Sequence, residues 1–221
     1  MTTESTERPL RHVRSFVRRP GRLTPAQDHA LQTLLSRYQW DPTLMADGAN
    51  WMIEIGFGNG QALVEMAQAE PEHRFIGVEV HPPGVGRLLN ALHEQAIENV
   101  CVAMVDAVAL LKQDIPDNAL SGVRIYFPDP WPKKRHHKRR LIQPDFVELL
   151  YAKLKPHGRV HLATDWAPYA EWMVEVFAGN PRFERVTDTT AWRPSTHFER
   201  RGQRRGHAIV DLLYQTRAGE G

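Results

Sequence analysis

Five short runs rich in aliphatic and β-branched residues alternate with five amphipathic segments, and this alternation limits the possible folds most strongly. The predicted strands span residues 50–56, 74–80, 100–106, 122–127 and 158–164. The predicted helices follow them at residues 60–70, 84–96, 107–113, 144–155 and 166–179. Because a helix follows each strand and returns the chain along the sheet, the pattern predicts a mostly parallel sheet covered on both faces.

Both ends of the chain extend this pattern. Residues 182–188 and 207–216 read as two strands without a helix between them, so we expect an antiparallel pair at the sheet edge. Near the other end, Thr24 can cap a helix that has Pro25 in its first position and Gln27 completing a capping box. The sequence thus predicts a seven-stranded α/β sandwich. We expect a single domain, residues 23–221, after a flexible Arg-rich segment, residues 1–22.

The composition excludes several classes of protein. A chain of 221 residues can bury a core without disulfides or a structural metal. Its one cysteine, Cys101, lies in an apolar run, where we expect a buried and unreactive thiol. No apolar stretch approaches the ~20 residues that span a bilayer, and no apolar signal core follows the N-terminus. We therefore expect a cytoplasmic protein that is not attached to a membrane.

Positive charges gather in three clusters, although the formal net charge is only +2. They lie in residues 8–22, in the basic strip 133–140, and in residues 200–205. Three separated basic clusters on an almost neutral chain predict a surface that binds a polyanion. Solvated tails and loops are the alternative for any one cluster. His136 and His137 in the strip lack ligand partners at helical spacing, so we expect no metal site.

The segment EIGFGNG places an acidic residue and three glycines at the end of the first predicted strand: Glu54, Gly56, Gly58 and Gly60. Glycine allows a tight turn and a close approach of the backbone to a ligand. The spacing is G-x-G-x-G, with Gln61 next, and differs from the G-x-G-x-x-G of dinucleotide-binding folds. A purely structural turn is the alternative. The pattern resembles the first motif of class I S-adenosylmethionine-dependent methyltransferases.

Two more carboxylates end the second and third predicted strands. Glu79 could accept both hydroxyl hydrogens of a ribose, and Asp106 could accept from an adenine amino group. Asp106 could instead cap the following helix, and Glu79 would suit NAD equally well. Acids at the ends of three successive strands favour an adenosine ligand, and the spacing of the glycine loop disfavours NAD.

The stretch YFPDPWPKKRHHKRR, residues 126–140, joins an acidic, proline-rich turn to the basic strip. Its three prolines restrict their own φ angles and the conformations of the residues before them. Asp129 and Trp131 therefore lie on stiff backbone, which suits the positioning of a nucleobase. The turn could instead serve only to pack Trp131 into the domain.

Together these motifs resemble the bacterial tRNA (guanine-N7-)-methyltransferase family over residues 51–215. The resemblance rests on EIGFGNG, GVEVHPPGVG, YFPDPWPKKRHHKRR, LATDW and STHFERRGQRRGH. It implies a Rossmann-like class I methyltransferase fold, S-adenosylmethionine as the methyl donor and tRNA as the partner. The implied product is 7-methylguanosine in the tRNA variable loop, at position 46. Monomer and homodimer both remain open.

The resemblance also assigns site residues. It implies a cofactor site formed by Glu54, Gly56, Gly58, Gly60, Glu79, Asp106 and Asp129, with Asp129 as the catalytic residue. It implies substrate contacts from Lys133, Asp165, Thr196, His197, Phe198 and Glu199. It implies RNA contacts from Arg135, His136, His137, Lys138, Arg139 and Arg140. His197 departs from the Lys or Arg of the family pattern, which leaves its side-chain contact in question.

Guanine chemistry fits these acids. Nitrogen-7 carries a lone pair and no proton, so methylation needs no general base, and alignment alone can supply roughly 7–11 kcal/mol. The Watson–Crick edge of guanine offers two adjacent donors, which suit an acceptor-only carboxylate. Asp129, Asp165 and Glu199 are the candidates, and Trp131 could stack on a splayed nucleotide or wall the pocket. Asp165 could instead cap the helix after it, and Glu199 could pair with Arg201.

Three other functions are considered. A methyltransferase with another acceptor would keep the glycine loop but would leave the basic strip without a purpose. An NAD-dependent oxidoreductase would need a pyrophosphate site that the loop spacing disfavours. A non-catalytic RNA-binding module would explain the cations but not the three strand-end acids.

Overall fold

The computed structural model describes residues 15–16, 21–187, 193–194, 196, 199, 206 and 208–217. Within them, seven strands form one sheet: β1 (Asn50–Ile55), β2 (His73–Val78), β3 (Val100–Ala103), β4 (Leu120–Tyr126), β5 (Leu154–Thr164), β6 (Phe183–Val186) and β7 (Val210–Thr216). Their order is β3-β2-β1-β4-β5-β7-β6. The first five strands run parallel, and β7 runs antiparallel to both β5 and β6. The predicted sheet and its antiparallel edge are confirmed.

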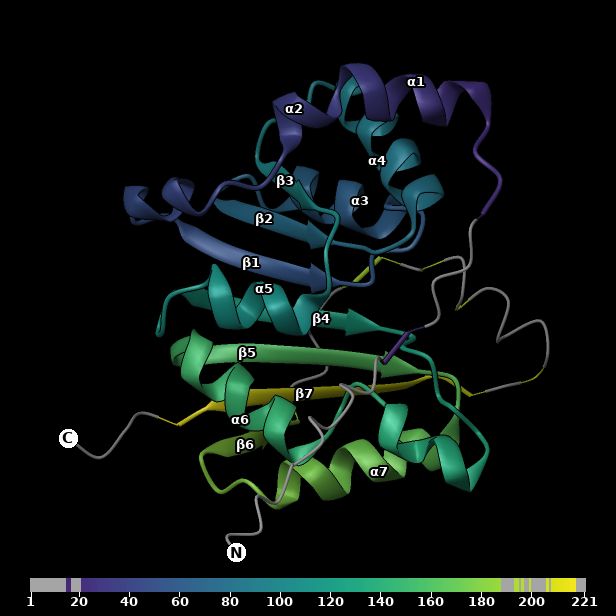
Figure 1. Cartoon of the computed structure of the whole chain (residues 1–221). Coiled ribbons are helices and arrows are strands. Elements are labelled where there is room, and N and C mark those ends of the chain that lie inside the picture. Colours follow the sequence, from purple (N-terminus) through teal and green to yellow (C-terminus); the bar gives the residue numbers. More distant parts are fainter. Residues whose placement is uncertain are drawn as a thin grey trace, which may run out of the picture.

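Helices cover both faces of this sheet (Figure 1). They are α1 (Pro25–Thr33), α2 (Leu35–Tyr38), α3 (Gln61–Ala69), α4 (Pro82–Glu94), α5 (Ala107–Gln113), α6 (Pro144–Lys153) and α7 (Ala167–Ala178), with two 3-10 helices, η1 (Pro42–Asp47) and η2 (Lys134–Arg139). The apolar residues of α5, α6 and α7 pack in one core, and those of α1, α3 and α4 pack in the other. None of the helices in the described part of the chain is long and apolar enough to cross a bilayer.

Alternation along β1 shows how the sequence divides between the two cores. Trp51, Ile53 and Ile55 face the core beneath α5, α6 and α7, and Met52 faces the other core. Glu54 has the same parity as Met52 and is buried on that second face. Successive strand residues point to opposite faces, so a strand buried on both faces reads as a continuous apolar run. The one acid in this run is therefore an exception to be explained.

The parallel order places the carboxyl ends of β1 to β5 at one edge of the sheet. The loops that follow β1, β2, β3 and β4 therefore meet there, as ligand-binding loops of open α/β sheets do. Thr24 caps α1 as predicted: its Oγ1 accepts the N–H of Gln27 at 3.3 Å, and Gln27 Oε1 accepts the N–H of Thr24 at 2.9 Å. The cap defines where α1 begins, and α1 packs closely against α4, where a Cβ on Gly86 would lie 2.6 Å from the Gln27 oxygen.

Several element boundaries differ from the predictions by a few residues, and three differences are notable. β3 ends at Ala103, three residues before Asp106, and Asp106 is the N-cap of α5. β5 begins at Leu154, directly after α6, and its pairing with β4 shifts register between Leu120 and Gly122. The basic strip forms η2, a helix that charge clustering does not predict. Cys101 is half-buried in β3, and burial raises the pKa of its thiol.

Candidate active site

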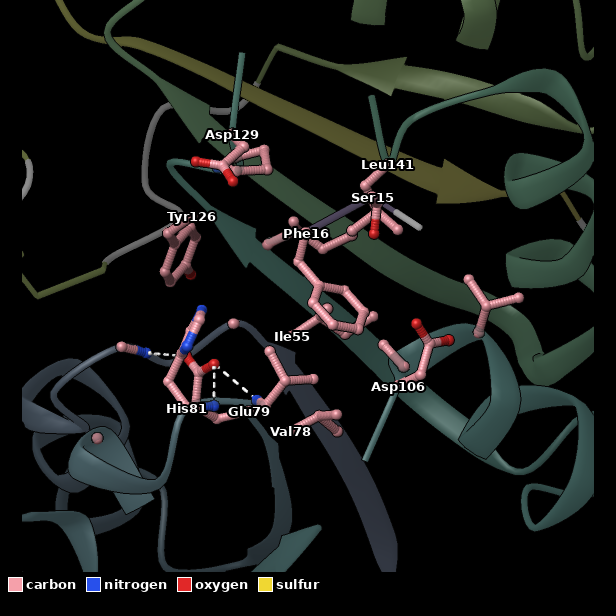
Figure 2. Close-up of a pocket in the computed structure, with 18 of the residues that line it drawn as sticks. Ser15, Phe16, Ile55, Val78, Glu79, His81, Asp106, Tyr126, Asp129 and Leu141 are labelled. Atoms are coloured by element: carbon pink, nitrogen blue, oxygen red, sulfur yellow. Dashed lines mark hydrogen bonds between the residues drawn. The ribbon is translucent and has the colours of Figure 1, made fainter. Parts of the chain in front are cut away.

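A cavity of about 280 Å³ opens at the carboxyl edge of the sheet. Figure 2 shows it bounded by loops from several strands, with Glu79, Asp106 and Asp129 around it and the side chain of Phe16 projecting between them. Apolar side chains of the strand ends, Ile55 and Val78 among them, form part of its wall. The cavity therefore combines an apolar wall with three convergent carboxylates, as small-molecule sites commonly do.

The glycine loop after β1 shapes one wall. Gly56 and Gly58 line the cavity with φ angles of +76° and +61°, a conformation that disfavours other residues. Gly60 lies outside the lining. It is the N-cap of α3, and a Cβ there would come within 2.8 Å of Leu88 in α4. Gly84 is equally constrained, because a Cβ on it would lie 2.1 Å from the Gly58 oxygen. The loop is thus packed closely against α4.

Glu79 joins the loops that follow β1 and β2. Its Oε2 accepts the N–H of Gly58 at 3.1 Å, and its Oε1 accepts the N–H groups of Val80 at 2.7 Å and His81 at 3.1 Å. These bonds appear as dashed lines in Figure 2. The side chain is buried and faces the cavity. Glu79 therefore holds the glycine loop in place as well as presenting a carboxylate to the cavity.

Glu54 lies behind the cavity and does not line it. Burial raises the pKa of its carboxyl group to about 8, nearby Glu79 adds to the shift, and Arg124 opposes it. Its Oε2 is buried and has no hydrogen-bond partner within the described residues. An acid with so high a pKa carries little charge at neutral pH, so Glu54 is largely protonated there.

Asp106 both caps a helix and faces the cavity, the two alternatives that the sequence left open. Its Oδ1 accepts the N–H of Ala109 at 3.0 Å and so caps α5, and the residue also lines the cavity. Val105 beside it is 41% exposed, and among the described residues only Met104 is likewise an exposed large apolar residue. An aromatic ligand ring lying there would cover Val105 and meet the carboxylate at its edge.

The Asp129 turn forms the mouth of the cavity. Asp129 is exposed and lines the cavity. Phe127 and Trp131, on either side of it, have φ angles of +53° and +45°. Such values cost of order 1–3 kcal/mol for residues other than glycine and persist only where surrounding contacts enforce them. The turn is therefore held by its neighbours.

Trp131 packs rather than facing the cavity. The Arg139 guanidinium lies 3.9 Å from the centroid of its ring, and His136 meets the ring edge-on at 5.8 Å. Its Nε1 donates to the Ser15 oxygen at 3.0 Å, and Arg139 donates to the Phe16 oxygen at 3.4 Å. Ser15 and Phe16 themselves line the cavity. The rest of the segment before residue 21, which we predict to be flexible, lies outside the described residues.

The basic strip has an exposed side and an inward side. Lys133, Lys134, Arg135 and Lys138 are exposed, whereas Arg140 is only 4% exposed. His136, His137 and Arg139 are half-buried. None of these residues lines the cavity, so the strip flanks it. The expectation that all six residues from 135 to 140 are available to RNA does not fit the burial of Arg140.

Of the remaining predicted substrate residues, the described ones, Asp165, Thr196 and Glu199, do not line the cavity. Asp165 directly follows β5. The N-cap of α7 is Trp166 rather than Asp165, and the Trp166 side chain makes no capping hydrogen bond. Thr196 is buried, and its Oγ1 accepts the N–H of Glu199 at 3.0 Å. His197 and Phe198 lie outside the described residues, as does Arg201. Glu199 does form an ion pair, but its partner is a residue that the sequence did not single out.

That partner is Arg193, whose Nη1 donates to Glu199 Oε2 at 2.5 Å. Its Nε and Nη2 donate to both carboxylate oxygens of Asp211 on β7. The guanidinium also lies 5.7 Å from the ring centroids of Tyr126 and Phe127 at the end of β4. Burial opposes the charge, but hydrogen bonds to Asp211 and Glu199 raise the pKa of Arg193 above its usual value. Arg193 thus joins three separate segments.

A chain of polar contacts runs from Arg193 to the cavity wall. Asp211 contacts His161 Nε2 at 3.0 Å, and His161 Nδ1 lies 3.2 Å from the hydroxyl group of Tyr126, which lines the cavity. Burial would raise the pKa of Asp211, but hydrogen bonds with His161 and Arg193 lower it. An acid within the apolar run VDLLY was the only sequence signal for this network, and nothing in the spacing connects it to Arg193.

Comparison with known proteins identifies the relatives of this chain. A family model described as "Putative methyltransferase" matches residues 49–212. A tRNA (guanine-N(7)-)-methyltransferase from Halorhodospira halophila is 48% identical over 222 residues, covering 94% of this chain and 96% of the relative. Proteins of the same name from Cronobacter sakazakii and Xanthomonas euvesicatoria are 47% and 50% identical, covering 94% and 98% of this chain and 92% and 68% of the relatives.

Solved structures share the fold at low sequence identity. A 16S rRNA (adenine(1408)-N(1))-methyltransferase from Catenulisporales acidiphilia, with its cosubstrate SAM, has a TM-score of 0.57 and 16% identity over 83% of this chain and 94% of that chain. A precorrin-6y C5,15-methyltransferase from Geobacter metallireducens has a TM-score of 0.54 and 17% identity over 87% of each chain. At these identities the likeness concerns the fold alone, which is that of class I Rossmann-like methyltransferases.

Proposed function

The chain belongs to the tRNA (guanine-N(7)-)-methyltransferase family, and we propose on this basis that it methylates nitrogen-7 of guanosine 46 in the tRNA variable loop. The methyl donor is S-adenosylmethionine, and the product is 7-methylguanosine. The observation that carries the proposal is the meeting of Glu79, Asp106 and Asp129 around one cavity, beside an exposed row of cations. A tRNA substrate also favours a cytoplasmic location, and a monomer or homodimer is compatible with the proposal.

The residues around the cavity fit the methyl donor, which supplies an electrophilic methyl group on a sulfonium sulfur. We assign Glu79 to the ribose hydroxyl groups and Asp106 to the adenine amino group, with Val105 covering the adenine ring. Gly56 and Gly58 allow the backbone to approach closely, because neither carries a side chain on this wall. We assign Glu54 and Gly60 to indirect roles, because Gly60 lets the loop pack against α4 and Glu54 is buried in β1 just before the loop.

Guanine recognition is assigned to the mouth of the cavity. Asp129 is exposed there and carries a carboxylate that can accept from both donors on the Watson–Crick edge of guanine. The same negative charge offsets the positive charge that methylation creates on the purine. Asp165 at the end of β5 and Glu199 beside Arg193 are the further acids available to the base. Nitrogen-7 has no proton to lose, so these residues need only hold and orient the base.

The exposed cations of the strip are assigned to the RNA backbone. Lys133, Lys134, Arg135 and Lys138 face solvent next to the Asp129 turn, so phosphates near the target base can reach them. Each neutralised phosphate makes the slope of log affinity against log salt more negative, by about 0.9 on duplex and 0.7 on single strands. The affinity for tRNA should therefore fall steeply as salt is added.

A methylation assay on one defined tRNA tests the proposal. The enzyme is incubated with methyl-labelled S-adenosylmethionine and an unmodified tRNA transcript, which is then digested to nucleosides. The expected label is in 7-methylguanosine, and it should disappear when guanosine 46 is replaced by adenosine. Label in a different nucleoside, or label that survives the replacement, would reject the assignment of base or position.

A further inference from the structure

Arg140 closes the basic strip in the sequence, but its side chain turns into the protein. It is 4% exposed, whereas Lys133, Lys134, Arg135 and Lys138 of the same strip are exposed. Burying a cation costs free energy unless hydrogen bonds or other contacts compensate for the lost hydration. A side chain buried in this way cannot contact a phosphate of a bound RNA. The position of Arg140 therefore calls for a role within the protein.

The contacts of Arg140 join three segments of the site. Its Nε donates to the Pro130 oxygen at 2.9 Å, directly after Asp129. Its Nη2 lies 3.2 Å from His137 Nε2 in η2, and its guanidinium carbon lies 4.9 Å from the ring centroid of Tyr169 in α7. The contacts are with a carbonyl, an imidazole nitrogen and an aromatic ring. Burial lowers the pKa of the Arg140 guanidinium, in keeping with this enclosure.

The platform beneath Arg140 is itself fixed. Tyr169 is fully buried, and its hydroxyl oxygen accepts the N–H of Ile142 at 3.2 Å. Trp172 Nε1 donates to the Ile142 oxygen at 2.7 Å. Both the N–H and the carbonyl oxygen of Ile142, two residues after Arg140, are therefore bonded to side chains of α7. A planar guanidinium can stack on this ring and donate sideways at the same time, which a lysine ammonium does not reproduce.

The Asp129 turn needs such an anchor. Phe127 and Trp131 have positive φ angles, and a turn of this kind relaxes unless contacts from elsewhere hold it. The hydrogen bond from Arg140 to the Pro130 oxygen is charge-assisted and meets the turn between Asp129 and Trp131. We infer that Arg140 is a positioning residue that holds the Asp129 carboxylate in place for guanine, and that it is not a phosphate ligand.

This inference rests on the proposed function, and two substitutions in the strip test it. Arg140→Lys keeps the positive charge but removes the Nε donor and the stacking plane, and Lys138→Met removes an exposed charge. We expect Arg140→Lys to lower kcat at least about tenfold while the salt dependence of tRNA binding keeps its slope. We expect Lys138→Met to raise KM for tRNA and to make the slope of log affinity against log salt less negative by about 0.7 to 0.9.

The opposite result for Arg140 would overturn the inference. A phosphate ligand would tolerate lysine, so normal kcat in Arg140→Lys, or a reduced salt slope in Arg140→Met, would reject the positioning role. Hydrogen exchange of peptides covering residues 127–142 gives a second readout, which should quicken in Arg140→Lys and stay unchanged in Lys138→Met. This readout needs no turnover, so it separates failure of the inference from failure of the proposed function, which would appear as an inactive wild-type enzyme.

Discussion

The two sides of the cavity are built in different ways. On the side of β1, β2 and β3, each functional group lies in the loop that follows a strand, and the loops after β1 and β2 bond to one another through Glu79. On the side of β4 and β5, the groups are joined by contacts between distant segments: Arg193 to Asp211, Trp131 to Ser15, and Arg140 to Tyr169. The first side is fixed by the sheet, and the second is fixed by contacts between distant segments, most of them made by arginines.

This difference suggests a functional division. The side of β1, β2 and β3 (the donor side) binds the methyl donor, and the side of β4 and β5 positions the guanine that accepts the methyl group. Strand ends in a sheet are rigid, which suits a ligand of constant shape such as a cofactor. The second side depends on arginines that each contact several segments. A single substitution there should therefore disturb the position of the guanine base more than the binding of S-adenosylmethionine.

Asp129→Asn should lower kcat by about 10²- to 10³-fold, because the amide cannot accept both guanine donors or offset the positive charge that develops on the base. Steady-state kinetics with tRNA measures the loss, and calorimetry measures cofactor affinity. The division predicts a much smaller change in cofactor Kd than in kcat. Asp145→Asn, in the first turn of α6, is the matched control. Equal losses in kcat and in cofactor affinity would show that Asp129 binds the methyl donor, which would contradict the division.

Arg193→Lys should lower kcat/KM for tRNA by up to about 10²-fold, because a misplacement of about 1 Å at a site can cost that much. Lysine keeps the charge, but it cannot bond both oxygens of Asp211 and also Glu199. Arg185→Lys, on the exposed face of β6, is the matched control. An activity equal to that of the control would show that Glu199 is positioned without Arg193.

The same division explains how much could be predicted from the sequence. Periodicity gave the sheet and its antiparallel edge, because those patterns are local. The positions of Glu79 and Asp106 followed directly, since a residue after a parallel strand has only one edge to occupy. The prediction of α5 at residues 107–113 is confirmed for the same reason.

Contacts over long sequence separations could not be predicted. Arg140 reads as one more cation of the strip, and its burial depends on Tyr169 of α7 arriving beneath it. Arg193 and Asp211 carry no motif, and their pairing depends on β7 lying beside β5. The position of Glu54 was predicted but its state was not, because a raised pKa comes from burial that only the packed fold supplies.

Glu79→Gln should weaken cofactor binding about tenfold or more, as hydrogen bonds to charged groups contribute roughly 1.5–3 kcal/mol. The carboxylate accepts three backbone N–H groups from two loops, and an amide would turn a donor toward one of them. Calorimetry with S-adenosylmethionine measures the change. The division further predicts that the salt slope of tRNA binding stays at its wild-type value. Full cofactor affinity would remove Glu79 from the donor side.

Glu54→Gln should give the smallest effect, a change in the pH dependence of stability. Burial raises the pKa of Glu54 from 4.5 to about 8. Between these values the unfolded chain has lost the proton that the folded chain retains, so the free energy of unfolding falls as pH rises through this window. Glutamine does not titrate, so the variant should gain in melting temperature relative to wild type from pH 5 to 8.

Above pH 8 the difference should become constant, because both states of the wild type are then ionised. Each kcal/mol corresponds to about 2–4 °C for a chain of this size. Thermal melts at several pH values measure the difference, with Glu94→Gln on the exposed part of α4 as the control. Parallel curves for wild type and Glu54→Gln would show that Glu54 is ionised in the folded protein, and a permanent charge would then lie behind the glycine loop.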